Sequence, residues 1–250
     1  MASLIMKFKQ IFLLIKRSYN AAVIRVPFNG TTRFKLPHSY FLKGTKISLN
    51  APSEPGLAYD FINLLLDDEY GLKSIKNHPK TIVDIGANIG LFSQMAGELF
   101  PKAKIHAYEP NPRLQKYLDQ NLKKVGVEFF PEAVGAFSGM GHSLETGDSR
   151  TGIFQKGGNT PIVAFSTVVE RIGGEIDLLK LDCEGGEWDI FENAVPFQKV
   201  RIIRMEYHLV DGKSLQDLKS AADRIGFRII KLVENSGFGI AWMESRSARG

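Results

Sequence analysis

Six ionisable residues alternate with apolar ones at the ends of two apolar stretches. They are Lys180, Asp182 and Glu184 at the end of 176–182, and Arg204, Glu206 and His208 at the end of 201–207. A period of two places alternate side chains on one face of a β-strand. If these strands are neighbours, two polar stripes lie side by side. Because buried charge is costly unless it is paired, we expect Lys180 and Arg204 to neutralise some of the carboxylates.

This cluster could remove a proton from a substrate hydroxyl, and we predict Asp182, Glu184 and His208 to be the catalytic residues. Structural alternatives exist for its neighbours. Glu206 could pair with Lys180, and Glu187 could favour the dipole of a helix that begins there. Carboxylates and one histidine could also hold a divalent cation. No complete ligand set can be recognised, so no metal site is predicted.

A second candidate site is the glycine turn in TIVDIGANIG, residues 81–90. Asp84 ends an apolar run, and Gly86, Asn88 and Gly90 follow at alternate positions. Glycines directly after a strand let the backbone approach a ligand closely. A dinucleotide would require Gly-x-Gly-x-x-Gly. Asn88 replaces the second glycine and Gly90 comes one position early, so the turn either holds another ligand or is purely structural.

The next apolar stretch ends in Tyr108-Glu109-Pro110-Asn111-Pro112. A carboxylate about 20 residues after a glycine turn can accept two hydrogen bonds from a ribose diol. Glu109 could instead be an ordinary exposed acid at a strand end. Its position relative to the glycines favours the ribose role.

The segments that must position these residues alternate regularly from residue 81 onward. Strands are expected at 81–86, 104–109, 127–134, 176–182 and 201–207, with helices at 89–100, 112–125, from 187 and at 214–225. Such alternation implies a parallel sheet covered on both faces. The closing strands 227–233 and 238–244 are joined by four residues and should pair antiparallel. The glycine-rich segment 135–160 predicts a hairpin or a loop.

Taken in order, these motifs resemble the class I S-adenosylmethionine-dependent methyltransferases, and the full set is similar to the FkbM-like family. The motifs are Asp84-x-Gly86-x-Asn88-x-Gly90, Glu109-Pro110-Asn111-Pro112, Ala133-Val134-Gly135, the segment 176–187 and Met205-Glu206-Tyr207-His208. The resemblance covers about 57–208. It implies a doubly wound, mostly parallel Rossmann-like α/β sheet with an antiparallel C-terminal hairpin. It also implies S-adenosyl-L-methionine as cofactor and O-methylation of a hydroxyl on a sugar or secondary metabolite.

The resemblance further implies which residues bind the cofactor. Gly86 and Gly90 would let the backbone reach its methionine part, and Asp84 would brace the turn or contact the amino group. Glu109 would accept from the ribose, and residues near Ala133 would lie against the adenine. The predicted cofactor-binding residues are Asp84, Gly86, Asn88, Gly90, Glu109, Pro110, Ala133 and Val134.

Two other functions are consistent with parts of the sequence. A nucleotide-dependent oxidoreductase would have the same fold class, but the broken glycine spacing and the lack of a clear hydride-transfer pair count against it. A non-catalytic cofactor-binding domain could instead dock on a membrane or a partner through the N-terminal helix. An intact cofactor site with no turnover on any acceptor would favour the non-catalytic domain.

We expect residues 1–75 to form an N-terminal α/β extension and residues 76–250 to form the methyltransferase domain that the resemblance implies. Short strands are expected within 22–50 and a helix at 57–70. The first 20 residues predict an amphipathic helix with one apolar face: Leu4, Ile5, Phe8, Ile11, Phe12 and Ile15. Its longest apolar run has five residues, far fewer than the roughly 20 that span a bilayer. We expect this helix to dock on its own domain; peripheral contact with a membrane is the alternative.

The 250 residues carry a net charge of +5, much of it near the two ends. The middle of the chain is close to balanced, which argues against nucleic acid as a partner. The resemblance implies a small-molecule acceptor instead, for example a saccharide. Cys183 is the one cysteine, so no internal disulfide can form, as is usual in a reducing compartment. We therefore expect a cytoplasmic location, with membrane association as the alternative.

Overall fold

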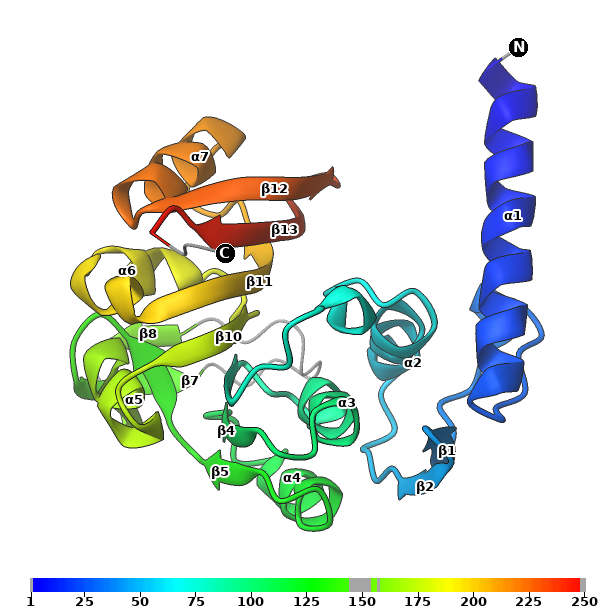
Figure 1. Ribbon diagram of the computed structural model, residues 1–250, viewed down its shortest axis with the longest axis horizontal. Helices are drawn as coiled ribbons and strands as arrows, with labels where there is room; N and C mark the ends of the chain where they lie inside the picture. Colours follow the sequence, from blue (N-terminus) through cyan, green and yellow to red (C-terminus); the bar gives the residue numbers. More distant parts are fainter. Residues whose placement is uncertain (1, 144–153, 157, 248–250) are drawn as a thin grey trace.

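The computed structural model describes residues 2–143, 154–156 and 158–247. A seven-stranded sheet forms its centre, in the order β12-β13-β11-β10-β3-β4-β5 (Figure 1). The strands are β3 (Thr81–Ile85), β4 (Lys104–Tyr108), β5 (Glu128–Phe130), β10 (Ile176–Leu181), β11 (Val200–His208), β12 (Phe227–Glu234) and β13 (Phe238–Ser245). Strands β11, β10, β3, β4 and β5 pair parallel, and β13 pairs antiparallel with both β11 and β12. The predicted fold class is therefore confirmed, including the C-terminal hairpin.

Helices cover both faces of the sheet because neighbouring strand residues point to opposite sides. Ile82 and Leu178 belong to one apolar cluster, with residues of α3 (Leu91–Leu99) and α4 (Gln115–Leu122). Val83 and Leu179 belong to a second cluster, with residues of α5 (Phe165–Ile172), α6 (Glu187–Phe191), the short helix η4 (Val195–Lys199) and α7 (Leu215–Arg224). The near-continuous apolar sequence of β3 and β10 follows from this double coverage.

The expected strand 127–134 is two strands in two sheets. Pro131 separates β5 from β6 (Ala133–Gly135), which pairs with β9 (Thr160–Ala164) in a four-stranded sheet of order β6-β9-β7-β8. The expected hairpin in 135–160 is formed by β7 (Gly139–Ser143) and β8 (Phe154–Lys156), and residues 144–153 and 157 lie outside the described part. Strand β9 and helix α5 were not expected from the sequence.

The N-terminal extension contains fewer strands than expected. Within 22–50, one hairpin forms from β1 (Ser39–Leu42) and β2 (Thr45–Ser48), and its turn residues Lys43 and Gly44 both have positive φ, as tight hairpin turns require. The predicted helix at 57–70 comprises α2 (Gly56–Phe61) and the π-helical continuation η2 (Ile62–Leu66). Short 3-10 turns, η1 (Thr31–Arg33) and η3 (Leu72–Ser74), complete the extension.

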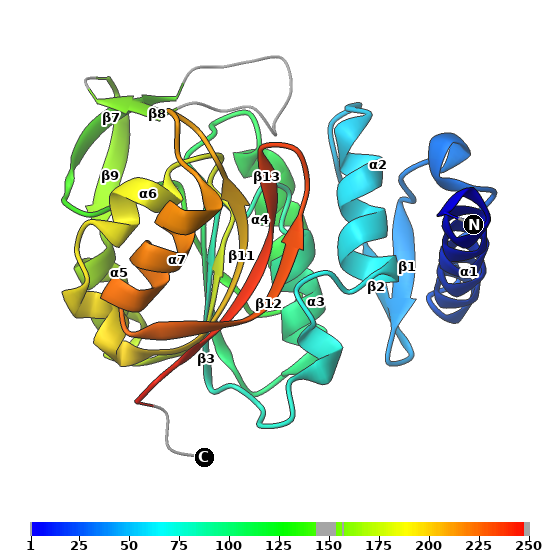
Figure 2. The same cartoon turned by 90° about the horizontal axis from the view of Figure 1, so that it is seen from above.

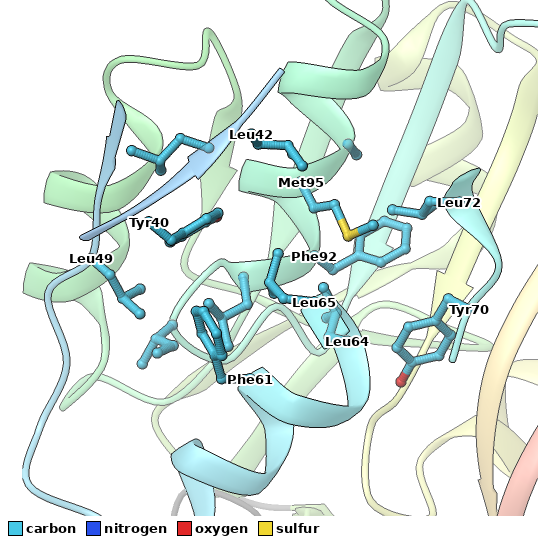
Figure 3. Packing of buried hydrophobic residues seen from close by; sticks show 14 of the residues in the cluster. Tyr40, Leu42, Leu49, Phe61, Leu64, Leu65, Tyr70, Leu72, Phe92 and Met95 are labelled. Carbon is cyan, nitrogen blue, oxygen red and sulfur yellow. The ribbon is translucent and has the colours of Figure 1, made fainter. Parts of the chain in front are cut away.

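The extension shares a core with the central domain (Figure 3). The rings of Tyr40 and Phe61 meet edge to face at 5.5 Å, and the Tyr70 ring meets that of Phe92 on α3 at 5.6 Å. All four side chains are buried. Segment 56–72 is thereby fixed against α3, which places its polar residues beside the carboxyl ends of the central strands.

The predicted N-terminal helix is α1 (Ala2–Val23), but the expectation that it docks through its apolar face is wrong. Phe8, Ile11, Phe12 and Ile15 are exposed, whereas Ala21 on the other side of the helix is buried. The side chains of Leu4 and Ile5 lie outside the described part. Among the described residues, no helix is both long and apolar enough to cross a membrane.

Candidate active site

A pocket of about 650 Å³ lies beyond the carboxyl ends of β3, β4, β10 and β11. Ligands of doubly wound sheets bind at this edge. Segment 57–70 of the extension and strand β6 form further walls. The polar side chains around the pocket include Tyr59, Asp60, Asn63, Glu69, Tyr70, Asn88, Tyr108, Glu109, Asn111, Glu132, Lys180, Asp182, Glu184, Asp189, Glu206 and His208. The pocket is therefore rich in carboxylates.

The two glycines of the turn after β3 are required for packing. Gly86 has a φ of 77°, and a Cβ there would lie 1.7 Å from the backbone oxygen of Asp182. Gly90 begins α3 with a φ of 87°, and a Cβ there would lie 2.8 Å from a side-chain carbon of Leu122 on α4. Gly86 also lines the pocket, so its missing side chain serves both the fold and a close approach of ligand.

Asp84 is fully buried beneath this turn. Its Oδ1 lies 3.2 Å from Lys180 Nζ, and its Oδ2 accepts a hydrogen bond of 2.7 Å from Ser93 Oγ. Lys180 Nζ also donates to the Gly86 backbone oxygen at 2.5 Å. Burial acts to lower the pKa of Lys180, but Asp84 and Asp182 outweigh it and raise this pKa, so Lys180 stays charged. The geometry supports the bracing role expected for Asp84 and the counter-ion role expected for Lys180.

Glu109 holds the backbone of both neighbouring turns. Its Oε2 accepts from the Asn88 N–H and its Oε1 from the Asn111 N–H, each at 2.9 Å. Burial raises the pKa of Glu109 to about 7, against the lowering effect of these two hydrogen bonds. Each carboxylate oxygen retains a lone pair, so a ribose diol could still donate to Glu109.

Other wall residues also fit an adenosine-bearing cofactor. Asn88 has a left-handed backbone with a φ of 51°, and its buried Oδ1 has no hydrogen-bond partner in the described part of the chain. An unpaired buried acceptor is costly, and a ligand that donates a hydrogen bond would satisfy it. Pro110, Ala133 and Val134 add an apolar wall. The residues present therefore fit S-adenosylmethionine.

The predicted catalytic residues come together at the other end of the pocket wall. Asp182 follows β10, and its Oδ2 accepts a 3.0 Å hydrogen bond from Tyr70 Oη and lies 3.5 Å from Lys180 Nζ. Glu184 does not continue the stripe of alternate residues, because β10 ends at Leu181 and Glu184 lies in a turn with a φ of 55°. This turn still brings the Glu184 carboxylate to the pocket.

His208 stands at the centre of a group of acids. Its Nδ1 lies 3.2 Å from Glu187 Oε1, and its Nε2 lies 3.4 Å from Glu184 Oε2 and 3.9 Å from Glu206 Oε1. Burial alone would lower the pKa of His208, but the hydrogen bond to Glu187 and the other carboxylates raise it to about 9. Burial, with Asp182 adding to it, raises the pKa of Glu184 to about 7 and that of Glu206 to about 8. At neutral pH the His208 imidazole is therefore protonated, and it faces two carboxylates whose pKa values lie close to neutral pH.

Arg204 does not take part as expected. Its guanidinium lies over the indole ring of Trp242 at 4.7 Å, and Nη1 donates to the Ile203 backbone oxygen at 3.2 Å. Burial lowers the pKa of Arg204 to about 10. The polar stripe on β11 is thus divided, with Glu206 and His208 lining the pocket and Arg204 packed against the C-terminal hairpin.

The sequence analysis underestimated two residues. Glu187 begins α6, as expected, but it is fully buried and also accepts hydrogen bonds from the backbone N–H groups of His208 at 2.7 Å and Gly185 at 2.9 Å. Tyr70, which holds Asp182, comes from the extension. Tyr70 ends the helix expected at 57–70, and its helical spacing contains no local signal for a role in the pocket.

The metal alternative has a definite geometry. One ligand atom each from Asp182, Glu184 and His208 lies within 4.8 Å of the others. Two carboxylates and an imidazole are ligands that divalent cations accept. The same proximity also follows from the ion pairs between these groups, so the expected lack of a metal site stays a prediction.

Comparisons with known proteins identify the family of the chain. A family model described as the methyltransferase FkbM domain matches residues 84–229, more than half of the chain. "Methyltransferase sdnD" of Sordaria araneosa is 35% identical over 81 residues, which cover 32% of this chain and 31% of that protein. The "AMB antimetabolite synthetase AmbE" of Pseudomonas aeruginosa is 35% identical over 65 residues, 26% of this chain and 3% of that protein. The chain thus matches only a minor part of the length of both curated relatives.

Among solved structures, a TehB-like SAM-dependent methyltransferase from Corynebacterium glutamicum is similar, with a TM-score of 0.45 and 14% identity. The similarity covers 76% of this chain and 97% of that one. The family match excludes the oxidoreductase alternative. With the motif residues gathered around one pocket that fits the cofactor, the chain belongs to the FkbM family of S-adenosylmethionine-dependent methyltransferases.

Proposed function

We propose that this methyltransferase acts on a hydroxyl group of a sugar or a secondary metabolite. The observation that supports this most directly is the group of carboxylates Asp182, Glu184 and Glu206 on the pocket wall. An alcohol is a poor nucleophile until its proton is removed, and a general base works best when its pKa lies near the working pH. The raised pKa values of Glu184 and Glu206, about 7 and about 8, meet that requirement.

The proposed base is a carboxylate rather than His208. With a pKa of about 9, the imidazole is already protonated at neutral pH and cannot accept a further proton. As a cation, His208 instead favours the ionised forms of Glu184 and Glu206, and Glu187 holds its ring in place. Tyr70 and Lys180 hold Asp182 in the same way, so the pocket presents fixed acceptors to a substrate.

The carboxylates also support a polyhydroxylated acceptor. Ionised carboxylates accept several hydrogen bonds each, so sugar hydroxyls are suitable partners. S-adenosylmethionine supplies an electrophilic methyl group when it is bound. The residues of the chain would align the acceptor, hold its proton and limit the access of water, and such positioning supplies much of the rate in methyl transfer.

The test is to incubate the protein with methyl-labelled cofactor and a library of sugars and hydroxylated metabolites, and then to identify the labelled product by NMR. We expect a methyl ether, which resists mild alkali. A methyl ester, which alkali cleaves, or an N-methyl product would contradict the proposal. If the protein binds the cofactor but labels no acceptor in the library or in a cell extract, the non-catalytic alternative would be favoured.

A further inference from the structure

Helix α1 presents an apolar face to solvent. The exposed fractions are 64% for Phe8, 71% for Phe12 and 63% for Ile15. Ile11, Tyr19 and Val23 are exposed as well. At 100° per residue these six positions fall within about 120° of the helix circumference. They therefore form one continuous apolar stripe along the helix, named here the α1 stripe.

The opposite side of α1 holds the helix to the protein. Arg17 pairs with Asp67 at 2.5 Å and donates to Thr31 Oγ1 at 2.9 Å. Asn20 Nδ2 donates to the Leu66 backbone oxygen at 2.6 Å. An amphipathic helix normally buries its apolar side, whereas α1 docks through polar side chains and the small Ala21. These contacts fix the direction in which the α1 stripe faces.

The position of α1 leaves this stripe accessible. The helix stands at one side of the molecule, with its N-terminal half extending beyond the neighbouring elements (Figure 1). Seen from above, it forms the outermost layer, and the β1–β2 hairpin and α2 lie between it and the central sheet (Figure 2). A flat surface could therefore approach the α1 stripe without meeting the catalytic domain.

The charge of the N-terminal part of the chain indicates what kind of surface would bind the α1 stripe. Residues 1–50 contain nine Lys and Arg and no Asp or Glu, while the remaining residues contain 23 basic and 27 acidic ones. Lys9 and Lys16 are exposed along one edge of the α1 stripe, and Lys7 is exposed near the other. Pairing α1 with α1 of a second copy would bring like charges together, whereas anionic lipid would neutralise them.

We propose that α1 binds peripherally to anionic membranes. The helix would lie in the plane of the interface, with the α1 stripe among the acyl chains and Lys7 and Lys9 at the lipid headgroups. Membrane-surface helices combine an apolar face with a basic polar face in this way. The inference concerns residues outside the pocket and does not depend on which acceptor is methylated.

The test is flotation of the full-length protein with vesicles of phosphatidylcholine, with and without phosphatidylserine. We expect binding to the anionic vesicles and little binding to the neutral ones, with a decrease at high salt. The variant Phe12→Glu/Ile15→Glu should bind at least about tenfold more weakly, because it loses two inserted side chains. Replacing Lys7 and Lys9 by Gln should weaken binding about fivefold for each charge removed.

The matched control is Val195→Glu, which places a charge on a residue that is 68% exposed in η4. It should bind vesicles like the unmodified protein, and circular dichroism should show that all variants are folded. The proposal is wrong if the unmodified protein does not float with anionic vesicles, or if the Phe12→Glu/Ile15→Glu variant floats equally well. It is also wrong if the protein ignores vesicles and forms a dimer that this variant dissociates, since the α1 stripe would then be an interface between copies.

Discussion

Glu109 makes cofactor binding depend on its protonation state. Its pKa of about 7 results from burial. Only the ionised carboxylate can accept hydrogen bonds from both hydroxyls of a ribose in addition to those from its two backbone N–H donors. Affinity for S-adenosylhomocysteine should therefore fall by up to about tenfold per pH unit as the pH drops below about 7. Calorimetry across a pH series measures this.

The control for this prediction is Glu109→Gln. The amide of Gln keeps the shape of the side chain, but it does not titrate and it accepts hydrogen bonds through only one of its two terminal atoms. The binding free energy for S-adenosylhomocysteine should therefore weaken by roughly 1–3 kcal/mol, and binding should lose most of its pH dependence. If the variant keeps the original slope, another group is responsible for the pH effect and Glu109 does not contact the ribose.

The carboxylates on the acceptor side predict a second effect. Asp182→Asn and Glu206→Gln should each bind cofactor nearly normally but lower turnover by at least about 10²-fold, the low end for loss of a general base. In the unmodified protein, turnover should rise with pH through about 7–8, because Glu184 and Glu206 become ionised there. Tyr70→Phe, which removes one hydrogen bond to Asp182, should have a smaller effect.

Full turnover of both variants at saturating acceptor would show that the cluster is structural and that alignment alone accounts for catalysis. A chelator provides a separate test of the metal alternative. Activity that is lost with chelator and restored by a divalent cation would identify Asp182, Glu184 and His208 as ligands.

At the scale of the elements, the turn after β3 is locked to the end of β10. Gly86→Ala would place a Cβ 1.7 Å from the Asp182 backbone oxygen, while Gly126→Ala, at a similar φ of 68°, meets nothing within 4 Å. The control should cost about 1–2 kcal/mol of the free energy of unfolding for its left-handed backbone. Gly86→Ala should cost roughly 1–3 kcal/mol more for the clash. Urea unfolding measures both, and equal losses would contradict the packing role of Gly86.

The central elements were predictable because their signals are local. Strands β3, β4, β10 and β11 are apolar runs that end in polar or glycine residues, and this pattern also located most of the site. The sequence predicted β5 and β6 as one strand of the central sheet. It could not place β6 in the smaller sheet, because the pairing partners of a strand are set by tertiary contacts. Helix α5 was missed in a segment rich in Val and Thr, whose β-branched side chains do not favour helices.

The site residues from the extension could not be predicted for a different reason. Tyr70 acts on Asp182 across 112 positions of sequence, and its place depends on how segment 56–72 packs on α3. For α1, the sequence pattern identifies the apolar face but not the docked face. That choice depends on Asp67 and Leu66, which lie about 50 positions away from their partners in the helix.

At the scale of the whole molecule, the raised pKa values predict how stability changes with pH. Glu109, Glu184 and Glu206 titrate at about 7, 7 and 8 in the folded protein against an ordinary 4.5, so the folded state holds these protons more tightly than the unfolded state. His208, raised from 6.5 to about 9, acts in the same direction. Stability should therefore fall as the pH rises from about 5 to about 9.

Melting temperatures in a series of buffers test this expectation. Glu206→Gln removes one of the titrating groups, so its profile should be flatter above about pH 6. A melting temperature that rises across the same range would show that the carboxylates are not held in their protonated forms by the fold.

The attachment of α1 to residues 66 and 67 has a thermodynamic consequence. The same short segment continues into Glu69 and Tyr70, which line the pocket, and Tyr70 donates to Asp182. If α1 binds lipid as proposed, the lipid surface and a ligand in the pocket act on one piece of chain. Any coupling between two binding equilibria is equal in both directions. The factor by which vesicles change the affinity for S-adenosylhomocysteine must equal the factor by which S-adenosylhomocysteine changes partitioning onto vesicles. Two independent titrations can therefore measure a single coupling free energy for this protein.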